Sequence, residues 1–331
     1  MSLISLLIAL AAQRSLSSPV WQFSFYFRRY CQLAINNQWV KSPWQSSLST
    51  FIFLLLPVVL VYVVLAAIDD TILHLVVSTL LLIVCFGCVQ TRECYKNYLN
   101  SAFRGELTTC ELHHQQLQQD KNLADMSFGQ ILVWLNFRYF IAIMIFFVLF
   151  GAPGALFYRL LLTLVENAAL KKVECEQANE QMADDTEQVE LAADDVESEV
   201  IGDSEDFTKH TATEQGYINH DAVECDYNAE VHGQLQKILF ILEWPLVRIV
   251  AFCYMLVGHF SKAFPIWLES VFNFSQSPHS VLVNVAEKSE DFMIDEGDCS
   301  AEPCILVRLA KRTLLLCLAV VSLLIITGVI T

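Results

Sequence analysis

The sequence predicts an all-α, polytopic membrane protein with four clear transmembrane spans and additional broken or interfacial helices. Hydrophobic residues make up 55% of the 331-residue chain, and they gather in runs instead of being spread evenly. A helix needs roughly 17–25 apolar residues to cross a bilayer. Four runs without Asp, Glu, Lys or Arg have this length, and they cover 51–68, 72–89, 139–158 and 313–331. Because lipid cannot hydrogen-bond to the backbone, these runs are expected to be helical throughout.

The N-terminal region 1–49 is expected to hold a short apolar helix and then a basic, aromatic interface helix. Residues 2–12 resemble the apolar part of a signal peptide, but no Lys or Arg precedes them, so we interpret them as a retained helix. Residues 14–44 combine four basic with eight aromatic residues and no acidic one, which is typical of a helix at the cytoplasmic interface. A transmembrane helical hairpin over 50–89 follows.

The middle of the chain alternates between polar segments and one very long apolar segment. Residues 90–128 are polar and mixed in charge, so a cytoplasmic helical loop is expected there. The region 129–170 is expected to be a broken membrane helix, because it is too long for one straight crossing and Gly151 and Pro153 interrupt it. A kinked helix and a re-entrant hairpin both remain open.

The net charge of −16 is concentrated in one stretch. Residues 174–206 hold fourteen acidic residues and no Lys or Arg, and the surrounding sequence is poor in aromatic residues. This composition predicts an acidic, disordered loop over 171–234, on a side of the membrane that the sequence leaves open. The rest of the chain is nearly neutral, so no nucleic acid partner is expected.

The C-terminal part is expected to begin with an amphipathic, membrane-associated helix over 235–272. A hydrophilic region over 273–312 and a C-terminal transmembrane helix over 313–331 should follow. Basic residues just before the last span, Arg308 and Lys311 among them, favour a cytoplasmic start for it.

Two places where polar groups enter apolar helices supply the candidate ligand-binding residues. The first place is Trp134-Leu135-Asn136-Phe137-Arg138, and the second is Glu243-Trp244-Pro245-Leu246-Val247-Arg248. In the second, Trp244 and Arg248 lie four apart on one helix face, where the guanidinium can stack on the indole. Ionisable groups in membrane helices are costly and tend to be paired or functional. An interface anchor is the favoured interpretation of the first place, and a structural ion pair is as favoured as a binding site at the second. The candidates are Asn136, Arg138, Glu243, Trp244 and Arg248, with Trp134, Tyr158, Arg159 and His259 as accessory residues.

No catalytic motif is complete, so no catalytic residue is assigned and the balance leans against an enzyme. The phosphate-cradling GxxxxGK[ST], GxSxG and HExxH patterns are absent. Cys110, His113 and His114 could be drawn as a metal cluster, but their spacing is incomplete. Neither a metal site nor a cofactor is expected.

An ordered set of short motifs runs through these segments. Its members are Tyr95-x-x-Tyr98-Leu99, Gly105-Glu106-Leu107, Trp134-Leu135-Asn136-Phe137-Arg138, Glu243-Trp244-x-x-Val247-Arg248, Gly258-His259 and Lys262-Ala263-x-Pro265-x-Trp267, followed by a C-terminal span. In this order the set resembles the AmpE family, inner-membrane proteins linked in name to β-lactamase induction. The acidic insert over about 174–230 departs from that pattern.

The resemblance implies a multi-pass protein of the bacterial inner membrane that regulates β-lactamase induction and the response to cell-wall antibiotics. It also implies a ligand sensed at the membrane, and the amidase AmpD or another cell-wall recycling component as partner besides the lipid bilayer. A homo-oligomer remains open.

A second resemblance supplies the alternative function. Residues 151–164 are similar to a stretch of the CobD/CbiB family, membrane enzymes that form an amide bond with ATP. A divergent amide synthase using Mg-ATP is therefore the alternative. Leu162 and Val165 stand where that family has Asn and Asp, which removes carboxylate and amide oxygens suited to Mg²⁺. A transporter ranks third, because the four spans carry almost no polar residues and show no inverted repeat.

Overall fold

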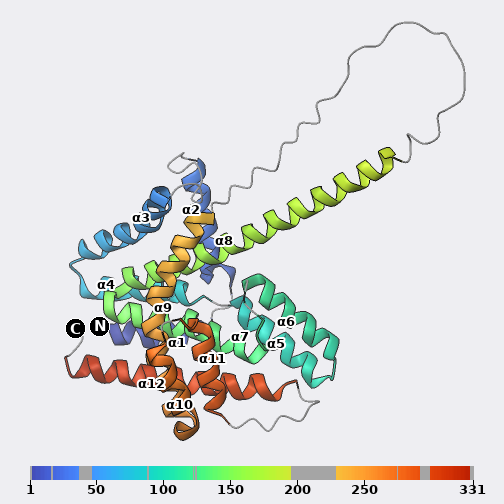
Figure 1. Cartoon of the computed structure of the whole chain (residues 1–331). Helices are drawn as coiled ribbons and strands as arrows, with labels where there is room; N and C mark the ends of the chain where they lie inside the picture. Colours follow the sequence, from blue (N-terminus) through green and yellow to red (C-terminus); the bar gives the residue numbers. More distant parts are fainter. Residues whose placement is uncertain are drawn as a thin grey trace, which may run out of the picture.

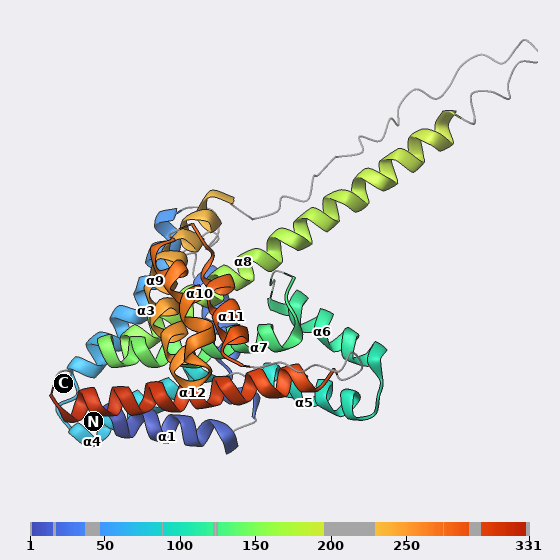
Figure 2. The same ribbon diagram turned by 60° about the horizontal axis from the view of Figure 1, so that its bottom comes forward.

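The computed structural model describes residues 2–15, 18–36, 47–87, 89–121, 123, 125–194, 229–273, 275–290 and 299–328. Every regular element in these ranges is helical, as the sequence predicts. The first part of the chain forms α1 (Ser2–Ser15), the short 3-10 turn η1 (Pro19–Trp21), α2 (Phe23–Asn36), α3 (Ser47–Ala66) and α4 (Thr71–Phe86). Helix α1 packs along α4, and its other side lies beside the C-terminal helix α12 (Ala301–Ile326) (Figure 2).

The second part of the chain holds a polar helical hairpin and the longest helical element among the described residues. Its elements are α5 (Val89–Phe103), α6 (Leu107–Lys121), α7 (Phe128–Asn136), the π-helical turn η2 (Phe137–Ile141) and α8 (Ala142–Asp194). Figure 1 shows the α5–α6 hairpin at one side of the helical body and the end of α8 projecting far beyond it. The third part comprises α9 (Ala229–Val257), α10 (Phe260–Phe272), α11 (Pro278–Lys288) and α12 (Ala301–Ile326).

Within the part of the chain that the structure describes, four stretches have the length and hydropathy to cross a membrane, so the chain is a multi-pass membrane protein. They are Leu48–Ala66, Phe128–Ala168, Glu230–Val257 and Ala301–Ile326. The run predicted as a second span over 72–89 is not among them, because α4 ends at Phe86 and is 16 residues long. It reaches spanning length only together with α5, across a bend of 43°.

The long apolar stretch from α7 into α8 is an antiparallel hairpin. Gly151 has φ 72° and ψ −163°, a conformation that suits glycine and cannot continue a helix. Tyr139 and Glu166 are 27 positions apart, about 40 Å along a straight helix, yet the Tyr139 hydroxyl donates to the Glu166 carboxylate at 2.6 Å. Phe146 also stacks on Tyr158, with ring centroids 4.9 Å apart. The chain therefore reverses at Gly151, which selects the hairpin over the kinked helix.

The acidic segment differs from the expected loop in its first part. Helix α8 continues through Asp194, well into the stretch 171–234 that was expected to be disordered. Glu, Gln, Lys and Ala are all good helix formers, and a composition that cannot build a core is equally compatible with a solvated helix. Residues 195–228 lie outside the described residues.

Two boundaries in the C-terminal part also differ from expectation. The helix expected over 235–272 is two helices, α9 and α10, which separate at Gly258 and His259. A Cβ on Gly258 would lie 2.3 Å from the Ser289 carbonyl oxygen, so α11 approaches too closely for any side chain there.

The hydrophilic region expected over 273–312 instead contains α11 and nearly half of α12. Helix α12 begins at Ala301 because its first turns are amphipathic. Leu306 and Leu309 are buried, while Arg308 and Arg312 are exposed on other faces. The charge content alone predicts a polar region here, although one face of this helical segment packs into the core.

Candidate functional site

The first candidate cluster is built around a Trp–Arg turn where α7 runs into η2. Trp134 and Arg138 are four positions apart, and the Arg138 guanidinium lies 4.5 Å from the centroid of the Trp134 ring. The helix widens here into a π-turn, in which the Ala142 N–H donates to the Phe137 carbonyl. Such π-turns occur often at functional sites because the extra residue changes where neighbouring side chains point.

Arg138 pairs with Glu243 of α9 in a two-pronged ion pair. Arg138 Nε donates to Glu243 Oε1 at 2.8 Å, and Nη2 donates to Oε2 at 3.0 Å. Tyr158, on the second leg of the hairpin, donates its hydroxyl to the same Oε1 at 3.0 Å. Glu243 is only 2% exposed, so one buried carboxylate connects both legs of the hairpin to α9. Pairs of this geometry are strong and directional.

Asn136 and His279 complete the surroundings of this cluster. The Asn136 Oδ1 atom is buried and has no hydrogen-bond partner within the described parts of the chain. His279 of α11 points its ring edge at Trp134, with centroids 6.0 Å apart. Burial, and then the charge of Arg138, lower the pKa of His279 below its ordinary value. His279 is therefore neutral near pH 7.

A second polar group lies further along the hairpin and reaches α6. Glu166 accepts from Tyr139 and forms an ion pair with Lys121 at 3.7 Å. Arg159 lies over the Tyr139 ring at 4.4 Å and over Phe23 of α2 at 5.2 Å. Tyr139 and Arg138 are consecutive in η2, so this group adjoins the Glu243 cluster.

The sequence analysis missed Glu166 and Lys121. The available signal was an acidic residue close to the end of a long apolar run, where an uncompensated charge is costly. Lys121 lies 45 positions from Glu166 in a polar helix, and no periodicity within one element links the two.

The second candidate cluster repeats the Trp–Arg turn on α9. The Arg248 guanidinium lies 3.9 Å from the centroid of the Trp244 ring. Arg248 donates to two backbone carbonyls, those of Trp244 and Asn273, each at 3.0 Å. Trp267 of α10 donates its indole N–H to the Arg248 carbonyl at 3.0 Å. Five positions separate Glu243 from Arg248, which places them on different faces of α9, so the five predicted binding residues divide between two clusters.

His259, the last accessory residue, lies at the junction between α9 and α10. Its backbone N–H donates to the Ser289 carbonyl at 2.7 Å, and its Nδ1 lies 3.2 Å from the same oxygen. The Gly258-His259 motif thus serves a close helix contact, away from both Trp–Arg turns.

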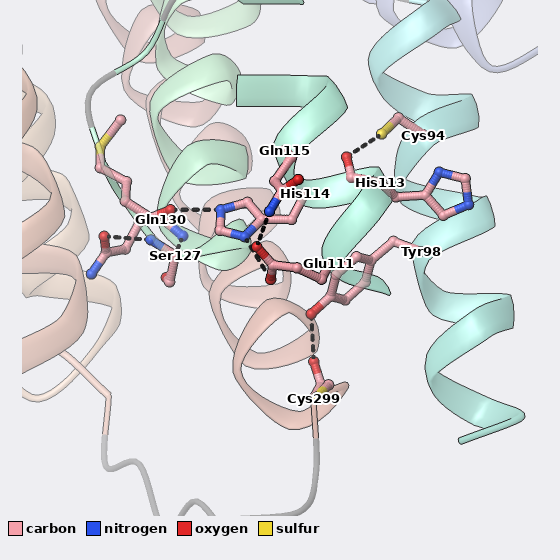
Figure 3. A network of polar contacts seen from close by, with 10 residues as sticks. Cys94, Tyr98, Glu111, His113, His114, Gln115, Ser127, Gln130 and Cys299 are labelled. Atoms are coloured by element: carbon pink, nitrogen blue, oxygen red, sulfur yellow. Dashed lines mark hydrogen bonds and ion pairs between the residues drawn. The ribbon is translucent and has the colours of Figure 1, made fainter. Parts of the chain in front are cut away.

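The residues that could have formed a metal cluster hold helices together instead (Figure 3). His114 Nε2 lies 2.8 Å from the Met126 carbonyl oxygen. Cys110 donates to the Tyr98 carbonyl at 3.7 Å. Ser127 caps α7 in a capping box with Gln130. Across the described ranges no three His, Cys, Asp or Glu side chains gather as metal ligands would. These contacts join the α5–α6 hairpin to the start of α7.

Comparison with known proteins agrees with the ordered motifs. The model of the family described as "Regulatory signalling modulator protein AmpE" matches residues 1–192 and 222–331. Protein AmpE of Shigella flexneri is 24% identical over 266 residues, which cover 77% of this chain and 74% of that protein. No solved structure matches. The family match spans both Trp–Arg turns and most of the chain, so the protein belongs to the AmpE family of regulatory signalling modulators.

Proposed function

We propose that this AmpE-family protein modulates β-lactamase induction from the bacterial inner membrane by sensing an anionic ligand at the Arg138–Glu243 cluster. The observation that carries the proposal is the buried carboxylate that ties Arg138 and Tyr158 of the hairpin to α9. A sensor needs an element with two packings that a ligand can bias. An ion pair between two helices, beside a π-turn, is such an element.

The charges in this part of the molecule favour an anion. Three cations, Lys121, Arg138 and Arg159, adjoin two carboxylates, those of Glu166 and Glu243. Arg138 offers a planar fork that matches carboxylate and phosphate groups. Asn136 lies two positions before Arg138 in the chain, and its buried Oδ1 atom has no hydrogen-bond partner within the described residues.

The proposed mechanism is competition for Arg138. An anionic group of the ligand takes over the N–H donors that now reach Glu243, and the hairpin loses its tie to α9. Tyr139, next to Arg138 in η2, is bonded to Glu166, and Glu166 pairs with Lys121 on α6. A change in η2 would therefore reach the α5–α6 hairpin.

Basic residues on this hairpin, including Lys96, Arg104 and Lys121, favour the cytoplasmic side for it. On this proposal the α5–α6 hairpin is the surface that AmpD or another cell-wall recycling component contacts. The alternative, a divergent amide synthase using Mg-ATP, stays a prediction that this geometry does not favour.

The test is β-lactamase induction by a cell-wall antibiotic in cells that carry this protein as their sole AmpE. Arg138→Lys keeps the charge but loses the fork, and Glu243→Gln keeps the shape but loses the charge. Each variant is expected to change the induction ratio about tenfold, the effect of roughly one lost charge-assisted hydrogen bond.

Arg312→Lys is the matched control. It makes the same chemical change as Arg138→Lys, but at an exposed position on α12 outside the cluster. Its induction ratio should equal that of the natural protein. Normal induction in Arg138→Lys and Glu243→Gln cells, with normal amounts of protein in the membrane, would exclude the cluster as the sensor.

A further inference from the structure

Arg248 is a buried cation whose hydrogen-bonding capacity is mostly unused. The residue is 6% exposed. A guanidinium has five N–H groups, and two of them reach the carbonyls of Trp244 and Asn273. The Nε atom is buried and has no hydrogen-bond partner among the described residues. Up to three N–H groups therefore remain for another acceptor.

The charge of Arg248 also lacks a carboxylate partner in the parts of the chain that the structure describes. The nearest acidic residue in sequence, Glu243, is used by Arg138. Two features compensate part of the charge: the indole of Trp244, and the C-terminal end of α10, whose last carbonyls carry about half a negative charge. Burying a cation with this little compensation is unfavourable, and a bound anion would remove the deficit.

The surface around Arg248 is apolar and suited to lipid. On α9 the neighbouring Ile249 is 58% exposed, and on α10 Leu268 and Phe272 are 42% and 75% exposed. Trp267 of α10 packs against Phe252 of α9, with ring centroids 5.1 Å apart. Aromatic side chains of this kind gather where a membrane meets water. A hydrogen-bond acceptor that reaches Arg248 from this surface either belongs to a molecule with apolar chains of its own or passes beside these apolar side chains.

We propose that Arg248 binds one phosphate group, carried by the headgroup of an anionic membrane lipid or by a soluble phosphate compound. The phosphate oxygens would take the unused N–H groups of the guanidinium fork, while the two carbonyls hold the fork in place. This site is distinct from the Arg138–Glu243 cluster and goes beyond the function proposed above.

The experiment uses the full chain reconstituted in nanodiscs. One set contains only zwitterionic phosphatidylcholine, and a second set also contains phosphatidylglycerol. Native mass spectrometry counts the retained lipid, and the thermal unfolding midpoint is measured in parallel. The natural protein should retain phosphatidylglycerol and unfold at a higher temperature in its presence. Arg248→Gln should retain about tenfold to a hundredfold less, the effect of one or two charge-assisted hydrogen bonds.

Arg312→Gln is the control for general attraction between a cation and anionic lipid, because it removes the same charge from an exposed position on α12. It should retain phosphatidylglycerol like the natural protein. If Arg248→Gln does not fold, Arg248→Lys keeps the charge without the fork and should give an intermediate retention. The natural protein alone also tests the proposal, since its thermal unfolding midpoint must rise when phosphatidylglycerol or phosphate is present.

A third arm distinguishes the two sources of phosphate. Inorganic phosphate is titrated onto the protein in phosphatidylcholine nanodiscs. A saturable rise in the midpoint that Arg248→Gln abolishes would identify a soluble phosphate compound, whereas a response to phosphatidylglycerol alone would identify a lipid. If neither anion distinguishes the natural protein from Arg248→Gln, the α10 terminus and the indole neutralise Arg248 by themselves, and the proposal is wrong.

Discussion

The two Trp–Arg turns of this molecule have the same local design and different partners. In each, the guanidinium covers an indole four positions earlier in its helix, at 4.5 Å for Arg138 and 3.9 Å for Arg248. Arg138 reaches a carboxylate on another helix, whereas Arg248, among the described residues, reaches backbone carbonyls alone. Glu243 precedes Trp244 directly in sequence, yet it neutralises the distant arginine. Tertiary packing, not sequence proximity, decides which turn is neutral.

The largest expected difference between the turns follows from removal of the shared carboxylate. Glu243→Ala leaves Arg138 buried without a partner and also strands the Tyr158 hydroxyl. The free energy of unfolding should fall by about 3–5 kcal/mol, the usual cost of breaking a buried ion pair on one side. Unfolding in mixed micelles of increasing denaturing-detergent content measures this change.

A double replacement separates two contributions to the lost stability: the absence of the ion pair, and the cost of burying Arg138 without a carboxylate partner. Arg138→Met combined with Glu243→Leu removes both charges at similar volume and should recover most of the lost stability, since apolar replacements of buried pairs are often neutral. If the double variant is no more stable than Glu243→Ala, the stranded charge is not what destabilises the single variant.

Replacement of the second arginine should cost less. Arg248→Leu loses two hydrogen bonds to carbonyls but leaves no opposite charge behind. We expect a loss of about 1–2 kcal/mol in phosphatidylcholine, where no anionic lipid contributes. The same unfolding assay ranks the two variants. A loss equal to that of Glu243→Ala would mean that Arg248 has an acidic partner after all.

The comparison also indicates what the sequence can and cannot predict. Uncharged runs predicted the all-helical, multi-pass fold, because a bilayer admits few other structures. The spacing of Trp244 and Arg248 predicted the stacked turn on α9, because helix geometry fixes neighbours four positions apart. Trp134 and Arg138 have the same spacing, but an interface anchor was the favoured interpretation there. These features depend on one segment at a time.

The pairing of Arg138 with Glu243 could not be predicted in the same way. It depends on the reversal of the chain at Gly151 and on how α9 packs across the hairpin, and no local rule gives either. From the sequence a kink and a hairpin both stayed open at Gly151, and only contacts between distant residues, Tyr139 with Glu166 and Phe146 with Tyr158, distinguish them. The first turns of α12 were missed for a related reason, since their core-facing side is defined by other helices.

The contributions of the two indoles, Trp244 and Trp134, to the free energy of unfolding should differ by a smaller amount. Trp244→Phe weakens the only ring beneath an arginine that has no carboxylate partner among the described residues, whereas Trp134→Phe weakens a ring beneath a neutralised one. We expect Trp244→Phe to cost about 0.5–1 kcal/mol more than Trp134→Phe through the cation–π contact. Unfolding of the two variants side by side in phosphatidylcholine tests the order. The reverse order would show that packing, not charge, sets the contribution of each ring.

The smallest expected difference is a dependence on pH that belongs to the first turn alone. His279 faces Trp134, and burial followed by the charge of Arg138 lowers its pKa below the ordinary 6.5. Because the folded protein holds His279 neutral while the unfolded chain takes up a proton near pH 6.5, its stability should be full above that pH and fall as the pH decreases below it. His279→Asn, which stays neutral, should flatten this part of the profile, and Arg248→Leu should leave it unchanged. An unaltered slope between pH 7 and pH 5 in His279→Asn would show that other groups carry the acid sensitivity and that the two turns respond to protons alike.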